Sequence, residues 1–215
     1  MYRALLALAL CLSCAGPVTT VAREKRNPVP FDVPMATLML EVHCLDEAGD
    51  EIIVHGTGVA VSPRLVVTAD HVATCIFQGI PISILATDRY GREASMVLLE
   101  SAKGDIDAAV LMSNAKHDFT YVPIAKSIGY GEVCIYSANP GPSWRYDCGE
   151  FVGWRKGKGW AGEGSFTYRG FFVSGSSGSG IFNDKWELVG VHVGGNVYDG
   201  YGIGYAVEHF SHLLK

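Results

Sequence analysis

The sequence predicts an all-β protein, built as a barrel or a sandwich of many short strands. The 215 residues include 26 glycines, and only 18% of them are charged. Short runs of β-branched and aromatic residues recur between turn residues, which is typical of antiparallel sheets. Few segments have the spacing of a helix. An architecture in which strands and helices alternate is therefore not expected.

The N-terminal half contains a series of short apolar segments that end in turn signals. The first two pair as a hairpin around the polar turn at residues 46–50, and Ser62-Pro63 turns the chain into the third. A helical turn is expected at 69–73, directly after the third strand. The polar segment 113–127 is expected to cross to the second half. The expected strands are 36–45, 51–61, 65–68, 80–86, 93–99 and the apolar run 108–111.

The C-terminal half repeats this pattern. A hairpin is expected from 132–137 and 148–154, with Asn139-Pro140-Gly141 at its turn. A glycine-rich loop covers 156–164. Apolar, strand-like pieces at 171–173 and 181–182 flank a run of small residues, and further strands are expected at 188–193 and 202–207. Residues 208–215 are expected to form a short helix.

The N-terminal segment is expected to direct export. Residues 1–22 contain one Arg, an apolar run too short to span a bilayer comfortably, and small residues that suit signal-peptide cleavage; a retained anchor is the alternative. Residues 23–34 are expected to be an extended linker. The mature chain is therefore predicted to be secreted or periplasmic, without a stable membrane span. Its net charge of −5 and lack of a long basic run argue against nucleic acid as a partner.

Four cysteines remain once the signal segment is removed, and an even number in an exported chain predicts two disulfides. Four cysteines allow three pairings. Cys134 and Cys148 lie symmetrically about Gly141, so they stand opposite each other in the predicted hairpin. This favours Cys134–Cys148 and, by elimination, Cys44–Cys75. These four cysteines include no C-x-x-C pair, so no metal site is expected.

The loop from Gly175 to Gly180 consists only of Gly and Ser, and it lies between apolar segments. Such a loop suits acyl transfer, in which a serine attacks a carbonyl and backbone N–H groups stabilise the oxyanion. In this interpretation Ser177 is the nucleophile, and the N–H groups of Gly175 and Ser177 form the oxyanion hole. A simple Gly/Ser turn between two strands is the alternative. The loop alone leaves both possibilities open.

A serine nucleophile needs a base and an acid that orients the base. His71 follows the apolar strand 65–67 after a Thr-Ala-Asp break, and Asp107 directly precedes a buried run. Asp105 would share the face of Asp107 on a strand, but Asp107 touches the apolar run directly and is favoured. Asp70 adjoins His71, where neighbouring side chains usually diverge. The other histidines lack comparable settings.

Five segments together resemble the trypsin-like (chymotrypsin-fold) serine proteases, most closely the protease core of the HtrA type without its PDZ domain. Gly56 to Val72 resembles the histidine motif, and Asp107 to Leu111 the aspartate motif. Gly175 to Asn183 resembles the serine motif. The remaining two, Gly131 to Gly141 and Gly202 to Val207, resemble a hairpin and the final strand of the family. These segments span nearly all of the chain from residue 35 onwards, in the order of the family.

The resemblance implies two six-stranded antiparallel β-barrels, at about 35–118 and 126–215, with the site between them. It implies that His71 is the general base, Asp107 its orienting acid and Ser177 the nucleophile of a serine endopeptidase. The substrate would be a protein or peptide, and no cofactor is needed. The chain departs from digestive members at Ser176, where they carry Asp, so activation by a freed N-terminus is not expected.

Residues 189–195 resemble the strand that lines the primary specificity pocket. A histidine at the place of His192 is similar to that of viral and glutamyl-specific relatives, where it contacts an acidic or amide side chain. The alternative is a histidine packed behind the pocket. Phe172, Val193, Gly194 and Gly195 complete the candidate substrate-binding residues. A virus-encoded polyprotein-processing protease and an inactive protease-like binding domain are the competing functions; the three intact triad residues count against the second.

Overall fold

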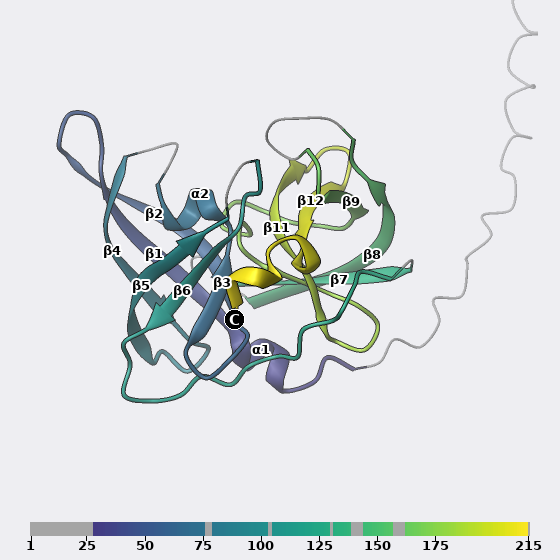
Figure 1. Cartoon of the computed structure of the whole chain (residues 1–215), viewed down its shortest axis with the longest axis horizontal. Coiled ribbons are helices and arrows are strands. Elements are labelled where there is room, and N and C mark those ends of the chain that lie inside the picture. Colours follow the sequence, from purple (N-terminus) through teal and green to yellow (C-terminus); the bar gives the residue numbers. More distant parts are fainter. Residues whose placement is uncertain are drawn as a thin grey trace, which may run out of the picture.

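Two closed six-stranded antiparallel β-barrels stand side by side in the computed structural model (Figure 1), which confirms the predicted fold class. The structure describes residues 28–75, 79–102, 105–129, 131–138, 144–156 and 162–214. The predicted signal segment 1–22 and the predicted turn at Asn139-Pro140-Gly141 lie outside these residues. In the described part of the chain, no helix has the length and apolar character needed to cross a membrane.

The N-terminal barrel has the strand order β1-β2-β3-β6-β5-β4. Side chains alternate along each strand, so every second residue of β1 points inward; Leu38, Leu40, Val42 and Cys44 are all fully buried. The short helix α2 (Asp70–Ala73) follows β3 directly. The strands are β1 (Thr37–Leu45), β2 (Glu51–Ala60), β3 (Leu65–Thr68), β4 (Ile80–Thr87), β5 (Glu93–Ser101) and β6 (Ala109–Ser113).

The C-terminal barrel has the order β10-β11-β12-β9-β8-β7 and a more aromatic interior. Phe166, Tyr168 and Tyr205 are among its largest fully buried side chains. The strands are β7 (Glu132–Ala138), β8 (Trp144–Trp154), β9 (Ser165–Arg169), β10 (Gly180–Phe182), β11 (Leu188–Asn196) and β12 (Tyr201–Ala206).

Both predicted disulfides are present. Cys134 pairs with Cys148 across the β7–β8 hairpin, where the two residues are direct partners in the strand register. Cys44, near the end of β1, is bonded to Cys75, two residues after α2. The first disulfide closes a hairpin, and the second ties the segment after α2 to the wall of its barrel.

Three expectations about secondary structure were wrong. The predicted linker 23–34 overlaps the helix α1 (Asp32–Ala36), which buries Val33 against the core and accepts a hydrogen bond from the Thr37 hydroxyl at the Val33 carbonyl, 2.8 Å away. The C-terminal segment forms two 3₁₀ turns, η1 (Val207–His209) and η2 (Ser211–Leu214), in place of one helix. Residues 171–173 are not a strand, because β9 ends at Arg169 and the N–H groups of Phe171 and Val173 donate to side-chain oxygens.

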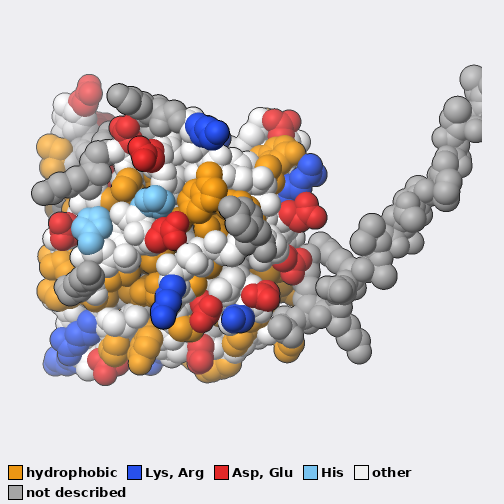
Figure 2. All heavy atoms as spheres, turned by 45° about the vertical axis from the view of Figure 1, so that its right-hand side comes forward, with side chains coloured by type: hydrophobic (Ala, Val, Ile, Leu, Met, Phe, Trp, Pro, Cys, Tyr) orange, Lys and Arg blue, Asp and Glu red, His pale blue; other side chains and the backbone are white. Residues whose placement is uncertain are grey.

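The surface carries charges of both signs. Figure 2 shows Lys and Arg side chains standing singly among acidic ones over the face in view. The net charge of the full chain is −5.

Candidate active site

His71 and Asp107 meet because their strands are neighbours. β3 pairs with β6, and the register sets Thr68 opposite Ala109. His71 lies three residues beyond the end of β3, in α2, and Asp107 lies two residues before β6 begins. The adjacent ends of two paired strands therefore bring the two side chains together.

The contact between His71 and Asp107 uses both carboxylate oxygens. Asp107 Oδ2 lies 2.7 Å from His71 Nδ1, and Oδ1 accepts the backbone N–H of His71 at 3.0 Å. Asp107 is only 5% exposed. A carboxylate at Nδ1 keeps the proton on that nitrogen, so Nε2 is the atom left to accept a proton. This arrangement can orient a general base.

The two other acids near His71 are held differently. The backbone carbonyl of Asp105 accepts a hydrogen bond from the hydroxyl of Tyr205, which is fully buried in the opposite barrel. Asp70 has one buried carboxylate oxygen, Oδ1, with no partner among the described residues. Burial raises the pKa of Asp70, while a hydrogen bond with Ser101 acts in the opposite direction. The acid at Nδ1 of His71 is Asp107.

The serine loop is tied to the N-terminal barrel through Thr57 of β2. The N–H of Thr57 donates to the Ser177 carbonyl at 2.8 Å, and its fully buried hydroxyl lies 2.9 Å from the Gly175 carbonyl. Gly56 lies between Ser177 and the helix that carries His71. A Cβ there would stand 2.6 Å from Val72 Cγ1 and 3.1 Å from the Ser177 carbonyl. The half-buried Ser177 is therefore held beside α2 by β2.

The backbone after Ser177 requires glycine. Gly178 has φ of +87°, and a Cβ would lie 1.9 Å from the Thr57 carbonyl and 2.3 Å from Thr68 Oγ1. Its N–H donates to the His192 carbonyl at 2.7 Å. The loop can approach β2 and β11 this closely only without a side chain at residue 178.

The predicted oxyanion donors lie in the same loop. The Ser176 carbonyl accepts the N–H of Ser179 at 3.0 Å. Because the peptide bond is trans, the N–H of Ser177 points in the direction opposite to that carbonyl. Gly175 adopts φ of +87°, a left-handed conformation open to glycine. The loop therefore turns the N–H of Ser177 away from its own interior.

The predicted substrate-binding strand β11 has an open edge beyond His192. β10 pairs with β11 only as far as Val191, whereas β12 pairs with it out to Asn196. The register of β11 shifts between His192 and Gly194, which marks a bulge at Val193. Among the described strands, none pairs with Gly194 and Gly195 on the β10 side. This edge can accept an extended peptide.

His192 is buried, with Nδ1 2.8 Å from the hydroxyl of Tyr168, which is also buried. Burial lowers the pKa of His192 to about 3, and the charge of His71 acts in the same direction. Burial also raises the pKa of Tyr168, so its hydroxyl keeps its proton. The pair is therefore neutral at ordinary pH.

Three residues with apparent roles in holding the site were missed in the sequence: Thr57, Tyr168 and Tyr205. Thr57 stands between two glycines in β2, a setting that signals close backbone approach. No sequence feature singled out Tyr168 or Tyr205, because a tyrosine in a strand is usually part of the packed core.

One cluster in the described residues has metal-ligand spacing, formed by Glu132, Cys134 and Cys148. Its two sulfur atoms are joined in a disulfide, so they are not the thiolates that bind zinc.

Comparisons with known proteins agree with this fold. A family model described as "Trypsin-like peptidase domain" matches residues 56–191. A similar solved structure is the inactive form of a serine-to-alanine mutant of Rv3671c from M. tuberculosis H37Rv. It has a TM-score of 0.65 and 15% sequence identity, and the match covers 85% of this chain and 86% of that one. At this identity the likeness concerns the fold alone. A search of curated proteins found no match.

Proposed function

Because the chain belongs to the trypsin-like peptidase family, we propose that it is a serine endopeptidase that acts through Ser177, His71 and Asp107. The observation that carries the proposal is the 2.7 Å contact between Asp107 and His71 Nδ1, beside a serine loop that β2 holds against the same barrel. Serine attack on a carbonyl requires this combination of an oriented imidazole and a nearby hydroxyl.

The proposed reaction has two stages. Nε2 of His71 takes the proton of Ser177 while Oγ attacks the peptide carbonyl, and Asp107 stabilises the imidazolium that forms. The N–H groups of Gly175 and Ser177 stabilise the oxyanion, and His71 then gives its proton to the leaving amine. A water molecule activated by His71 hydrolyses the acyl-enzyme. One oxyanion donor typically contributes about 3–4 kcal/mol to the transition state.

The proposed substrate is a protein segment in extended conformation. It adds to the open edge of β11 at Val193, Gly194 and Gly195 through backbone hydrogen bonds. We assign His192 to recognition of a glutamine or glutamate side chain before the scissile bond. The imidazole is neutral, and its hydrogen bonds with the Tyr168 hydroxyl and with the Ile203 backbone fix its orientation.

The proposal includes export from the cytoplasm. Disulfides persist in oxidising compartments, and this chain has two. Together with the signal-like segment 1–22, they support the proposal that the chain acts in the secreted or periplasmic space.

Cleavage of a peptide library tests the function. The purified chain and its Ser177→Ala variant are incubated with peptides of varied sequence, and products are identified by mass spectrometry. We expect internal cleavage by the wild type, none by the variant, and Gln or Glu before most cleaved bonds. Equal cleavage by both proteins, or none by a folded wild type, would refute the proposal.

A further inference from the structure

Phe172 covers the residue that is assigned here to side-chain recognition. Its ring centroid lies 4.8 Å from that of His192, at an interplanar angle of 45°. The ring also lies against Gly195: a Cβ built at that glycine would be only 2.4 Å from Phe172 Cζ. Phe172 is 7% exposed and His192 only 2%. The phenyl ring therefore fills the space between two residues that the proposed function assigns to substrate.

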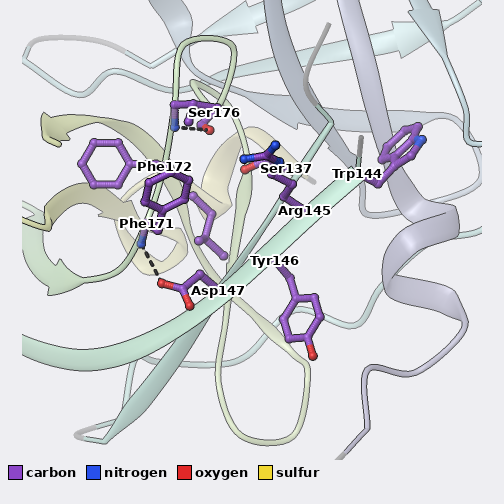
Figure 3. A pocket seen from close by; sticks show the side chains of 10 residues that line it. Ser137, Trp144, Arg145, Tyr146, Asp147, Phe171, Phe172 and Ser176 are labelled. Atoms are coloured by element: carbon purple, nitrogen blue, oxygen red, sulfur yellow. Dashed lines mark hydrogen bonds between the residues drawn. The ribbon is translucent and has the colours of Figure 1, made fainter. Parts of the chain in front are cut away.

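The segment that carries Phe172 lies beyond the strand ladder, because pairing between β9 and β12 ends at Arg169. Backbone hydrogen bonds hold its two ends: Gly170 N–H donates to the Gly200 carbonyl at 3.1 Å, and the Val173 carbonyl accepts the Ser176 N–H at 3.0 Å. Between them, Phe171 N–H donates to Asp147 Oδ2 at 2.7 Å, and Val173 N–H donates to Ser176 Oγ at 3.1 Å (Figure 3). Phe172 belongs to no strand, so its ring can move without breaking the strand ladder.

Two cavities border Phe172. One, of about 460 Å³, lies between this segment and β7–β8, and its wall combines Trp144 with the polar side chains of Arg145 and Asp147 (Figure 3). A second, of about 450 Å³, lies toward Val197 and Gly200. Phe172 lines both cavities. The first cavity offers room into which the ring can rotate, beside Ile135 and Trp144.

We propose that Phe172 is the gate of the specificity pocket, closed over His192 until a substrate side chain displaces the ring into the cavity beside Ile135 and Trp144. The inference rests on the proposed function. It makes Phe172 a specificity-determining residue, because only a side chain that gains enough from His192 opens the pocket. Because only open molecules bind the substrate side chain, the apparent affinity for substrate is reduced in proportion to the fraction of molecules that are open.

Kinetics with matched peptides test the specificity role. Three peptides differ only in Gln, Glu or Ala before the scissile bond, and they are cleaved by wild type, Phe172→Ala and Phe172→Leu. We expect Phe172→Ala to raise kcat/KM for the Gln peptide about tenfold relative to the Ala peptide, as when an open state populated roughly one-tenth of the time becomes dominant. Phe31→Ala, which removes an exposed ring far from the site, serves as the matched control. An unchanged ratio in folded Phe172 variants would overturn the gate.

Accessibility of His192 tests the gate without any activity. Diethyl pyrocarbonate modifies unprotonated imidazole, and the low pKa keeps His192 unprotonated at mildly acidic pH, so its modification rate reports access. In the Ser177→Ala background we expect a slow rate with Phe172 present and a several-fold faster rate in Phe172→Ala, measured on the peptide that contains His192. His209, which is partly exposed, provides the internal reference.

The two experiments separate the gate from the function on which it rests. If no variant cleaves any peptide but His192 becomes reactive without Phe172, the proposed function fails and the covering role remains. If His192 reacts equally fast in both proteins, the gate is wrong even for an active peptidase. Phe172→Leu, which keeps apolar packing with a smaller side chain, carries the same expectations if Phe172→Ala does not fold.

Discussion

The two barrels contribute their halves of the candidate site in different ways. In the N-terminal barrel, the β3–β6 register brings His71 and Asp107 into contact. In the C-terminal barrel, the serine loop lies outside the strands, and its carbonyls are held by Thr57 of the other barrel. The base and its acid are therefore built within one barrel, whereas the placement of the serine depends on how the barrels pack together.

The largest expected effect on activity concerns His71 and Asp107, which the N-terminal barrel carries. Asp107→Asn should lower kcat by about 10⁴, because the amide favours the wrong imidazole tautomer. Asp105→Asn is the matched control and should lower kcat far less, since the carboxylate at His71 Nδ1 is that of Asp107. Steady-state kinetics of both variants, with circular dichroism as a check of folding, decide the assignment. A large loss in Asp105→Asn alone would reverse it.

The next effect tests the contact between the barrels. Thr57→Val removes the hydroxyl that faces the Gly175 and Ala138 carbonyls. Leaving buried polar groups without partners costs about 1–3 kcal/mol, and if that cost falls on the active loop kcat/KM should fall by roughly five- to 150-fold. Thr57→Ser keeps the hydroxyl and should retain most of the activity. If Thr57→Val is as active as the wild type, the loop does not depend on this contact.

A smaller effect is expected from the second link between the barrels. Tyr205→Phe removes the hydrogen bond to the Asp105 carbonyl and loosens the segment that carries Asp107. A net loss of about 1 kcal/mol corresponds to a roughly fivefold fall in kcat, with KM unchanged. Tyr121→Phe, at a half-exposed site, is the control. A rise in KM without loss of kcat would place Tyr205 in substrate binding instead.

The smallest effect concerns pH. Burial raises the pKa of Asp70 in the folded protein above its value in the unfolded chain. The folded state then binds the proton more tightly, so stability falls as the pH rises through the two pKa values. Asp70→Asn should therefore raise the free energy of unfolding at about pH 7 and leave it unchanged near pH 3, where both forms are neutral. Urea titrations at the two pH values measure this; equal effects at both would contradict it.

The sequence was sufficient for most of the regular part of the molecule, although strand β9 was not predicted. The strands are local patterns of apolar and turn residues, and the Cys134–Cys148 pair follows from hairpin symmetry. His71 and Asp107 could be found because each stands next to an apolar strand. These features depend on a few neighbouring residues.

The features that the sequence did not predict depend on distant partners. Thr57 reaches Gly175 across 118 positions, and Tyr205 reaches Asp105 across 100. Phe172 was expected in a strand-like segment, yet its neighbours donate to side chains and its ring packs on His192. Local propensity favours a strand at 171–173, but tertiary contacts decide its conformation.

The central claim is that Ser177 is an activated nucleophile, and labelling with a fluorophosphonate probe tests it most directly. The wild type, Ser177→Ala and Ser174→Ala, which changes an exposed serine of the same loop, are treated in parallel and the labelled peptide is identified. We expect labelling of Ser177 in the wild type and in Ser174→Ala, and none in Ser177→Ala. Labelling that persists in Ser177→Ala, or its absence from a folded wild type, would contradict it.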